Sequence, residues 1–551
     1  MSESDGLDGG SKWCKLLRSE SPIGDNRLSR TLAMRSTILL ITILLLAPCH
    51  GGTSPVSTQN NSTQDKLYVS HYENVLGTSL ELKIVAASPA QSDKAERAVL
   101  AEIDREAHIL SSWDPDSEFS RWFRTMNQPV DISPELFEVL NLFDRWRDRT
   151  GGALDASAET ITRVWKNAAA QKRLPAESEL CAAVTSVKRV HWKLDPVRQM
   201  ATHTSDAPLA LNSFVKSYIV GRAANAALGV PGVRATVVNI GGDLVIGGEW
   251  SEHVDISDPK SDAENSAPLA RLVLRNQTVA TSGDYRRGVE IEGWHYSHIV
   301  DPRTGMPANE IISSTVVAPT PADAGALATA LSVLTPEESE RLVAAIPGAE
   351  YMLVKKNGEK IMSRGWRSLE APASSATAEA RPAGFFRTAA VQSGASLWND
   401  KYELTVTMTL SLIDGYRVRR PYVAVWIEDE NHSPVRTIAL WYAKFKFLHE
   451  LNSWSRVESL RSPSDDTHVL NSTSSATRPP GKYTFKWDGK DDFGKLVRAG
   501  KYNVMIEAAR EHGTDQIMRQ EIDFDGSPKQ FQIPGGVEIA SASLDYHKIA
   551  Q

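Results

Sequence analysis

The sequence predicts an α+β domain in the N-terminal two thirds of the chain, followed by an all-β sandwich. Two observations lead to this expectation. Between about residues 65 and 365, apolar residues recur with both the helical and the strand period, which is typical of a mixed fold. After about residue 402, apolar and polar residues alternate between turn-rich joints, which indicates antiparallel strands.

The length of 551 residues allows two or three domains. We expect, in chain order, a signal or targeting segment at 1–49, a tether at 50–65, an α+β domain at 66–367, a linker at 368–384 and a β-sandwich at 385–551. The tether and the linker are both rich in small residues and lack a hydrophobic period, which indicates flexible connections.

Individual elements follow from the same periodicity. Helices are expected at 92–111, 133–149, 213–228 and 321–333. Strands are expected in the first domain at 79–86, 235–240, 270–280, 312–318 and 350–355. In the second domain the alternation predicts strands at 402–410, 423–427 and 483–487, and a further strand after Gly500.

Composition excludes some functions. The net charge is −7, and no block of like charges interrupts the chain, so a nucleic acid partner is not expected. With 41% apolar residues the chain can bury a full core. Its three cysteines, Cys14, Cys49 and Cys181, lack metal-ligand spacing and are too few for a disulfide framework.

The N-terminus has the layout of an export signal. An apolar core at 36–48 follows the basic residues Arg30 and Arg35, and it is shorter than the roughly 20 residues that span a bilayer. A short membrane anchor is the alternative. Met1 and Met34 are both possible starts, because a signal beginning at Met34 has ordinary proportions.

Four motifs contain candidate chemistry, and each also has a structural explanation. Residues 237–243 run from a β-branched strand into two glycines and Asp243. Glycines let the backbone approach a ligand, but a tight hairpin turn also explains them. Residues 280–287 end a strand in hydroxyls, a glycine and paired arginines, which suits a phosphate or a solvated loop.

The other two motifs contain ionisable side chains. Residues 296–307 bring His298, Asp301 and Arg303 within six positions of a loop punctuated by proline and glycine. A helix opening at 212–213 places Lys216 in its first turn, where the helix dipole disfavours a cation. A bound anion would remove that conflict; a solvent-facing lysine is the alternative.

These four motifs, in this order, resemble those of the ApbE family, the FAD:protein FMN transferases. Three further segments fit the same order. Residues 75–78 are similar to the family's Met-Gly-Thr, with Leu76 in place of Met. Residues 112–121 are similar to its aromatic Ser-Arg stretch, and residues 152–165 are similar to the segment before its central helix. The resemblance implies an ApbE-like flavin transferase domain over residues 66–367. The C-terminal part resembles an Ig-like, predicted periplasmic domain that is sometimes fused to ApbE domains.

The resemblance implies an activity and a location. Family members use Mg²⁺ to break the diphosphate of FAD and transfer FMN to a Thr or Ser of a target protein, with release of AMP. The expected partner is an exported flavin-accepting redox protein. The protein is then expected in the periplasm or on the outer face of the inner membrane. Family members are often lipoproteins, so Cys49 either carries a lipid or is removed by cleavage just beyond it.

The resemblance also implies site residues. His298 and Asp301 would lie near the transferred phosphate, with Asp301 orienting His298, accepting a proton or only shaping the turn. Trp113 would stack on a planar ring or be an ordinary buried tryptophan. Residues expected to line the FAD site are Leu76, Trp113, Ala153, Leu154, Asp155, Lys216 and Ile299, and those expected at the metal are Ser213, Gly325 and Thr329.

Two departures from the family leave the activity open. Ala210 and Gly325 stand where the family has aspartates, and glycine has no side chain with which to bind Mg²⁺. Thr329 is retained, one helical turn after Gly325. Asp323 is expected to cap the helix with Thr320 rather than to replace the missing ligand. An active transferase, a non-catalytic FAD-binding or scaffold protein and an FAD pyrophosphatase therefore all remain possible.

Overall fold

The computed structural model describes residues 65–549, except for 262, 284–287, 372–396, 414–419, 444, 460–473 and 512. Residues 65–551 form one compact unit. The expected signal segment, both start methionines, Cys49 and most of the linker lie outside the described residues. A search of the described part finds no helix with the length and hydropathy needed to cross a membrane.

An antiparallel sheet forms the centre of the N-terminal region. Within the described residues it has eight strands, in the order β1-β2-β6-β7-β10-β13-β14-β15. Their bounds are β1 (Lys66–Val75), β2 (Thr78–Ala86), β6 (Val233–Ile240), β7 (Asp243–Gly248), β10 (Thr278–Gly283), β13 (Ile311–Ala318), β14 (Glu350–Lys355) and β15 (Lys360–Met362).

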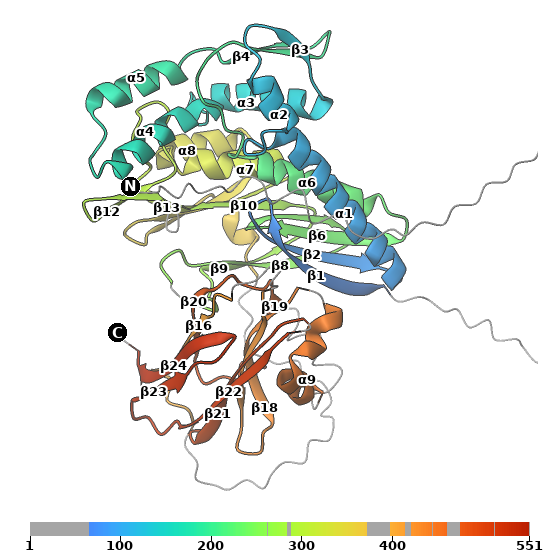
Figure 1. Ribbon diagram of the computed structural model, residues 1–551, viewed down its shortest axis with the longest axis vertical. Helices are drawn as coiled ribbons and strands as arrows, with labels where there is room; N and C mark the ends of the chain where they lie inside the picture. Colours follow the sequence, from blue (N-terminus) through green and yellow to red (C-terminus); the bar gives the residue numbers. More distant parts are fainter. Residues whose placement is uncertain are drawn as a thin grey trace, which may run out of the picture. The chain divides into compact units, whose positions relative to one another are not determined.

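Both faces of this sheet are covered. The helices α1 (Pro89–Leu110), α6 (Val215–Leu228) and α7 (Pro321–Leu331) pack on one face (Figure 1). Buried residues that alternate along the strands, such as Leu82 and Val238, join the core beneath these helices. Residues that point to the opposite face of the strands, including Val237, join a second core with the hairpin of β8 (Glu252–Ile256) and β9 (Ala270–Leu274). The alternation of buried residues thus decides which face each side chain fills.

The described residues of this region form further elements. They are α2 (Glu118–Phe123), β3 (Pro129–Asp131), α3 (Pro134–Arg149), η1 (Ala156–Ala158), α4 (Glu159–Ala170), α5 (Glu177–Val187), β4 (Trp192–Asp195), β5 (Met200–His203), β11 (Gly288–Ile291), β12 (Trp294–Ser297), α8 (Pro336–Ala344) and η2 (Trp366–Ser368).

Helix α7 begins as the sequence predicts. The hydroxyl of Thr320 accepts a hydrogen bond from the backbone N–H of Asp323 at 3.2 Å, and Pro321 occupies the first turn. This helix lies very close to α6, because a Cβ on Gly221 would be 2.5 Å from Cγ of Pro321. The close contact therefore fixes the spacing between α6 and α7, the helix that contains Gly325 and Thr329.

The helices expected at 92–111, 133–149, 213–228 and 321–333 are confirmed within a few residues as α1, α3, α6 and α7. The single strand expected at 270–280 is wrong, since the structure has two strands, β9 and β10. Asn276 lies between them with a φ of +50°, and this left-handed residue turns the chain into a second sheet. Backbone pairing with β9 also continues as far as Ala371.

The C-terminal region contains two further sheets, shown in orange and red in Figure 1. Among the described residues they have the strand orders β20-β16-β24-β23 and β19-β18-β17-β21-β22. Apolar residues from both sheets, including Val406 and Val425, share one core, as expected of a sandwich. The elements are β16 (Tyr402–Leu410), β17 (Tyr422–Glu428), β18 (Pro434–Trp441), η3 (Phe445–Glu450), α9 (Asn452–Glu458), β19 (Ser474–Ser475), β20 (Gly481–Trp487), β21 (Lys501–Ala509), β22 (Asp515–Asp523), β23 (Lys529–Pro534) and β24 (Ile539–Lys548).

Candidate functional site

Two hairpin turns meet at one end of the eight-stranded sheet. The first joins β1 to β2 through Leu76, which is half-buried with a φ of +49°. The second joins β6 to β7 through Gly241 and Gly242, with φ of +56° and +91°, so the hairpin explanation of this motif is confirmed. The backbone N–H of Gly241 donates to the carbonyl of Ser79 at 3.1 Å, which holds the two turns together.

Lys216 reaches this end of the sheet from the first turn of α6. Its Nζ donates to the carbonyl oxygen of Gly241 at 3.1 Å and lies 3.2 Å from Oδ1 of Asp243. The side chain remains 31% exposed. Lys216 is thus held against the Gly-Gly turn, with part of its surface open to a ligand.

Asp243 is the buried partner of this lysine. Its Oδ2 accepts a hydrogen bond of 2.5 Å from the hydroxyl of Ser217, the next residue of α6. Burial raises the pKa of the Asp243 carboxyl, while the Lys216 ammonium and the Ser217 hydroxyl oppose that rise. The lysine and the hydroxyl therefore favour the charged form of this carboxyl group, which burial disfavours.

Two of the three expected metal residues lie in contact. The hydroxyl of Thr329 on α7 donates to the carbonyl oxygen of Ser213 at 2.8 Å, and the hydroxyl oxygen of Ser282 lies 3.5 Å from that of Thr329. Gly325 lies one turn earlier on α7 and is buried. It contributes only backbone to this group.

These oxygens meet part of what Mg²⁺ requires. Mg²⁺ prefers oxygen ligands, and proteins commonly supply one or two carboxylates while substrate phosphates supply more. Among the residues that the structure describes, no group of three or more His, Cys, Asp or Glu side chains is placed to hold a metal. The Ser213 carbonyl and the Thr329 hydroxyl therefore fit a cation that takes most of its other ligands from a bound phosphate.

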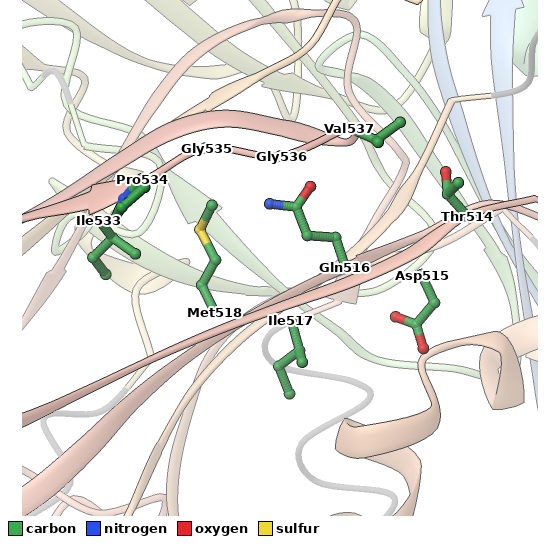
Figure 2. A pocket seen from close by; sticks show the side chains of 10 residues that line it. All are labelled: Thr514, Asp515, Gln516, Ile517, Met518, Ile533, Pro534, Gly535, Gly536 and Val537. Atoms are coloured by element: carbon green, nitrogen blue, oxygen red, sulfur yellow. The ribbon is translucent and has the colours of Figure 1, made fainter.

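A cavity of ≈410 Å³ elsewhere, in the C-terminal region, offers no comparable chemistry (Figure 2). It lies between residues 514–518, at the start of β22, and residues 533–537, at the end of β23 and in the turn before β24. Asp515 is the one ionisable side chain among the described residues that line it. The side chain of Gln516 accepts hydrogen bonds from the backbone of Glu538 and Ile539. This cavity is therefore shaped by structural contacts.

A larger cavity of ≈470 Å³ lies beside the loop that contains Asp155. Asp155 is buried; its Oδ1 accepts from the N–H of Ser157 at 2.8 Å, and its Oδ2 is 2.9 Å from Nε of Arg147. Pro302 and Arg303 line the other side, so residues far apart in the sequence share this space. Its lining contains three basic residues, Arg147, Lys188 and Arg303, and two acidic residues, Asp148 and Asp155, so the cavity offers charged groups of both signs to a polar ligand.

Asp301 orders the loop opposite that cavity. Its Oδ1 accepts from the backbone N–H of Arg303 at 2.8 Å, and its Oδ2 accepts from Nη2 of the same arginine at 3.0 Å. Its carbonyl accepts from the N–H of Gly305 at 2.8 Å. The carboxylate therefore shapes the turn. His298 is exposed on the same loop, directly after β12, and Ile299 is half-buried.

Three of the expected flavin-site residues differ sharply in exposure. The side chains of Ala153 and Leu154 are buried in the main core, so only their backbone is available to a ligand. Trp113 is 75% exposed, so the alternative of an ordinary buried tryptophan is wrong. Its indole is open to a stacking partner.

The segment before α6 links these parts. The backbone N–H of Ala210 donates to the carbonyl of Ala156 at 2.9 Å, beside Asp155. The N–H of Leu211 donates to the hydroxyl of Ser112 at 3.1 Å, beside Trp113. The same segment leads to Ser213 and Lys216, so it links these two residues to the neighbours of Asp155 and Trp113.

Sequence reasoning missed several residues of this site. Ser217 follows the motif lysine and lies four positions after Ser213, a helical spacing that would have placed both on one face. Arg147 gave no comparable signal, because its pairing with Asp155 depends on how α3 ends. Residues 284–287, which include the paired arginines of the second motif, lie outside the described residues.

The fold and the site together define an α+β protein in which Lys216, Asp243 and the Ser213–Thr329 oxygen pair lie at one end of the sheet, and a β-sandwich follows in the chain. The sequence model of the ApbE family matches residues 76–353, half of the chain, and the chain belongs to that family. Residues 403–541 match a second family model, described as "Predicted periplasmic protein (DUF2271)".

Individual relatives agree with this assignment. The chain is 26% identical over 329 residues to the FAD:protein FMN transferase of Klebsiella pneumoniae, covering 58% of this chain and 91% of that protein. It is 26% identical over 292 residues to the enzyme of the same name from Escherichia coli, covering 51% and 82%. The crystal structure of the ApbE protein from Thermotoga maritima matches with a TM-score of 0.50 at 24% identity, covering 56% of this chain and 100% of that one, which shows the shared fold.

Proposed function

We propose that this protein is an FAD:protein FMN transferase, which moves FMN from FAD to a Thr or Ser hydroxyl of an exported redox protein and releases AMP. Membership of the ApbE family and the names of the relatives support this activity. One structural observation supports the proposal for this chain: Lys216 in the first turn of α6 lies at the same end of the sheet as the Ser213 carbonyl, just before α6, and the Thr329 hydroxyl of α7.

FAD would bind across the surface that the segment before α6 connects. The exposed indole of Trp113 is suited to stacking on a ring of FAD, and Leu76 and Ile299 would supply apolar contact. Lys216 would contact the diphosphate. Asp155 would fix the loop at the neighbouring cavity, where Ala153 and Leu154 offer their backbone.

In the transfer, the oxygen of the acceptor hydroxyl forms a bond to the FMN phosphorus, and the bond from that phosphorus to the AMP oxygen breaks. The hydroxyl proton needs an acceptor. We assign this role to His298, because it is exposed and carries a basic ring nitrogen. Asp301 assists by holding the loop through Arg303.

We propose Mg²⁺ as the required cation; when bound, it neutralises charge that develops on the phosphates. The Ser213 carbonyl and the Thr329 hydroxyl would hold it, beside the face of α7 that contains Gly325. Bound FAD would supply phosphate oxygens as further ligands.

A non-catalytic FAD-binding or scaffold protein is a second candidate. Gly325 and Ala210 favour it, because neither supplies the carboxylate that the family has at those positions. An FAD pyrophosphatase would use the same residues with water in place of the acceptor hydroxyl.

We further propose that the protein is exported, as the signal-like N-terminus and the description of the second family model support. It would act in the periplasm or on the outer face of the inner membrane, held there by a lipid on Cys49. The boundaries that we propose are 66–367 for the transferase domain, 368–384 for the linker and 385–551 for the sandwich.

The test is to incubate the purified protein as exported with FAD, Mg²⁺ and a fragment of a flavin-accepting redox protein, and to weigh the fragment by mass spectrometry. A Mg²⁺-dependent gain of one FMN is expected. An unmodified fragment with intact bound FAD, while an established family enzyme modifies the same fragment, would favour the binding protein. Release of FMN and AMP without modification would favour the pyrophosphatase.

A further inference from the structure

The space around Gly325 is already filled. A Cβ built on this glycine would overlap the hydroxyl oxygen of Ser217 and would lie 3.0 Å from Cβ of Ser217 and 3.1 Å from Cα of Phe214. Contacts this short require a neighbour to move. Position 325 is thus a glycine because the Ser217 side chain occupies the room that any larger residue would need.

The Ser217 side chain is also held in a defined direction. Its hydroxyl donates to Oδ2 of Asp243 at 2.5 Å, and both side chains are buried. Turning the hydroxyl away to admit a side chain at 325 would break this hydrogen bond and leave a buried carboxylate less well satisfied. Ser217 and Asp243 therefore act as one unit beside the α7 face that contains Gly325 and Thr329.

We propose that Ser217 and Asp243 together replace a metal-binding side chain at position 325. In this proposal, which rests on the proposed function, the Ser217 hydroxyl becomes a third protein oxygen for the cation beside the Ser213 carbonyl and the Thr329 hydroxyl. Asp243 is a positioning residue that supplies negative charge through the Ser217 hydroxyl.

The charge balance gives Lys216 a part in this arrangement. Its ammonium group lies 3.2 Å from Oδ1 of Asp243 and offsets the carboxylate charge. Because the lysine is partly exposed, it can turn to a bound phosphate at little cost, whereas Asp243 is fixed in the interior. A diphosphate ligand would then draw Lys216 away and leave the carboxylate charge available to a cation, so cation and diphosphate binding should reinforce each other.

The same packing predicts a coupling between positions 217 and 325. Gly325→Asp alone should destabilise the protein and fail to improve cation binding, because the new side chain collides with Ser217. Ser217→Gly with Gly325→Asp removes the obstruction and moves the carboxylate to α7. That double variant should bind a cation at least as tightly as the wild type.

Mn²⁺, which shares the preference of Mg²⁺ for oxygen ligands, is a suitable probe. Binding is measured on the protein as exported, with and without ADP, from the electron paramagnetic resonance signal of free Mn²⁺ after subtraction of a protein-free control. Ser217→Ala and Asp243→Asn should each weaken Mn²⁺ binding at least about tenfold, the size of effect seen when metal ligands lose their supporting groups. Thermal unfolding of each variant identifies those that do not fold, and the milder Ser217→Ala keeps the test valid if Asp243→Asn is unstable.

Two results would overturn the proposal: folded Ser217→Ala that binds Mn²⁺ as the wild type does, or Gly325→Asp that gains affinity without a change at 217. The proposed function is judged separately by FMN transfer. If the wild type transfers FMN while Ser217→Ala and Asp243→Asn both retain the wild-type affinity for Mn²⁺, the transferase activity is supported and the proposed cation site is wrong. If Mn²⁺ binding depends on Ser217 but no FMN is transferred, the site stands and the transferase is wrong.

Discussion

The hydroxyl of Thr329 donates to the carbonyl oxygen of Ser213 at 2.8 Å, across 116 positions of sequence. This hydrogen bond joins the last turn of α7 to the segment that leads into α6. Because α6 and α7 also touch at Gly221 and Pro321, the two oxygens are held by packed helices. A site built on rigid helices positions ligands more accurately than one built on loops.

Lys216 provides the first prediction. Lys216→Met keeps most of the side-chain length but removes the charge that we assign to the diphosphate. Hydrogen bonds to charged groups contribute about 1.5–3 kcal/mol, so the Kd for FAD should rise roughly 10- to 100-fold. Fluorescence quenching of FAD, measured in EDTA, gives this Kd without a contribution from a cation.

The matched control is Lys193→Met, on the exposed side of β4. It should leave the Kd for FAD unchanged. Equal affinities for the two variants would contradict the role of Lys216 in binding the diphosphate.

Trp113 provides the second prediction. Its side chain is 75% exposed and so contributes little to the core, which means that Trp113→Ala should leave the melting temperature nearly unchanged. Stacking of an aromatic side chain on a base contributes about 1–3 kcal/mol, so the same change should weaken FAD binding by roughly 5- to 150-fold. Trp294→Ala is the control, because Trp294 is 70% exposed on a hairpin. If the two variants bind FAD equally well, Trp113 does not stack on the ligand.

Much of the fold was predictable because its signals are local. α1 and α7 begin with a hydroxyl cap followed by proline, and their apolar periods are long. The break at Asn276 was not predictable, because the strand pattern continues across it and only the pairing of β9 with β8 reveals two strands. Local pattern therefore located the elements, while the pairing partners had to come from the structure.

The site was predictable to a smaller extent. A motif pointed to Lys216 and the family resemblance to Thr329, but Ser217 and Asp243 are 26 positions apart and nothing in the sequence links them. The exposure of Trp113 could not be predicted either, because its burial depends on which residues pack over the loop. A residue's neighbours in space decide its role here, and those neighbours come from several different elements.

The contact between α6 and α7 provides the third prediction. Gly221→Ala places a Cβ 2.5 Å from Cγ of Pro321, so the helices must separate or distort. Overpacking of this kind costs about 1–3 kcal/mol in the free energy of unfolding. Gly229→Ala, at the end of the same helix, is the control; its Cβ would meet nothing closer than 3.5 Å and its φ is −69°. Urea unfolding that gives the same free energy for both variants would show that the helices have room to spare.

A buried carboxyl group on α1 should make the free energy of unfolding depend on pH. The Glu106 side chain is fully buried, 2.6 Å from Nη2 of Arg105 and 3.2 Å from Nε of Arg222. Burial raises the pKa of this carboxyl to about 7; the two arginines oppose the rise, and the nearby Glu102 and Glu135 add to it. In the unfolded chain the same group has an ordinary pKa of 4.5.

Glu106 accordingly provides the last prediction. Between pH 4.5 and about 7 the folded protein retains a proton that the unfolded chain has released, so the free energy of unfolding should fall as the pH rises through this window. Glu106→Gln cannot lose a proton there, and it should flatten this part of the pH profile. Asp104→Asn, on an exposed side of the same helix, is the control and should keep the wild-type slope. Urea unfolding at pH 5, 6, 7 and 8 compares the three proteins, and a Glu106→Gln profile that falls as steeply as the wild type would mean that Glu106 is charged throughout.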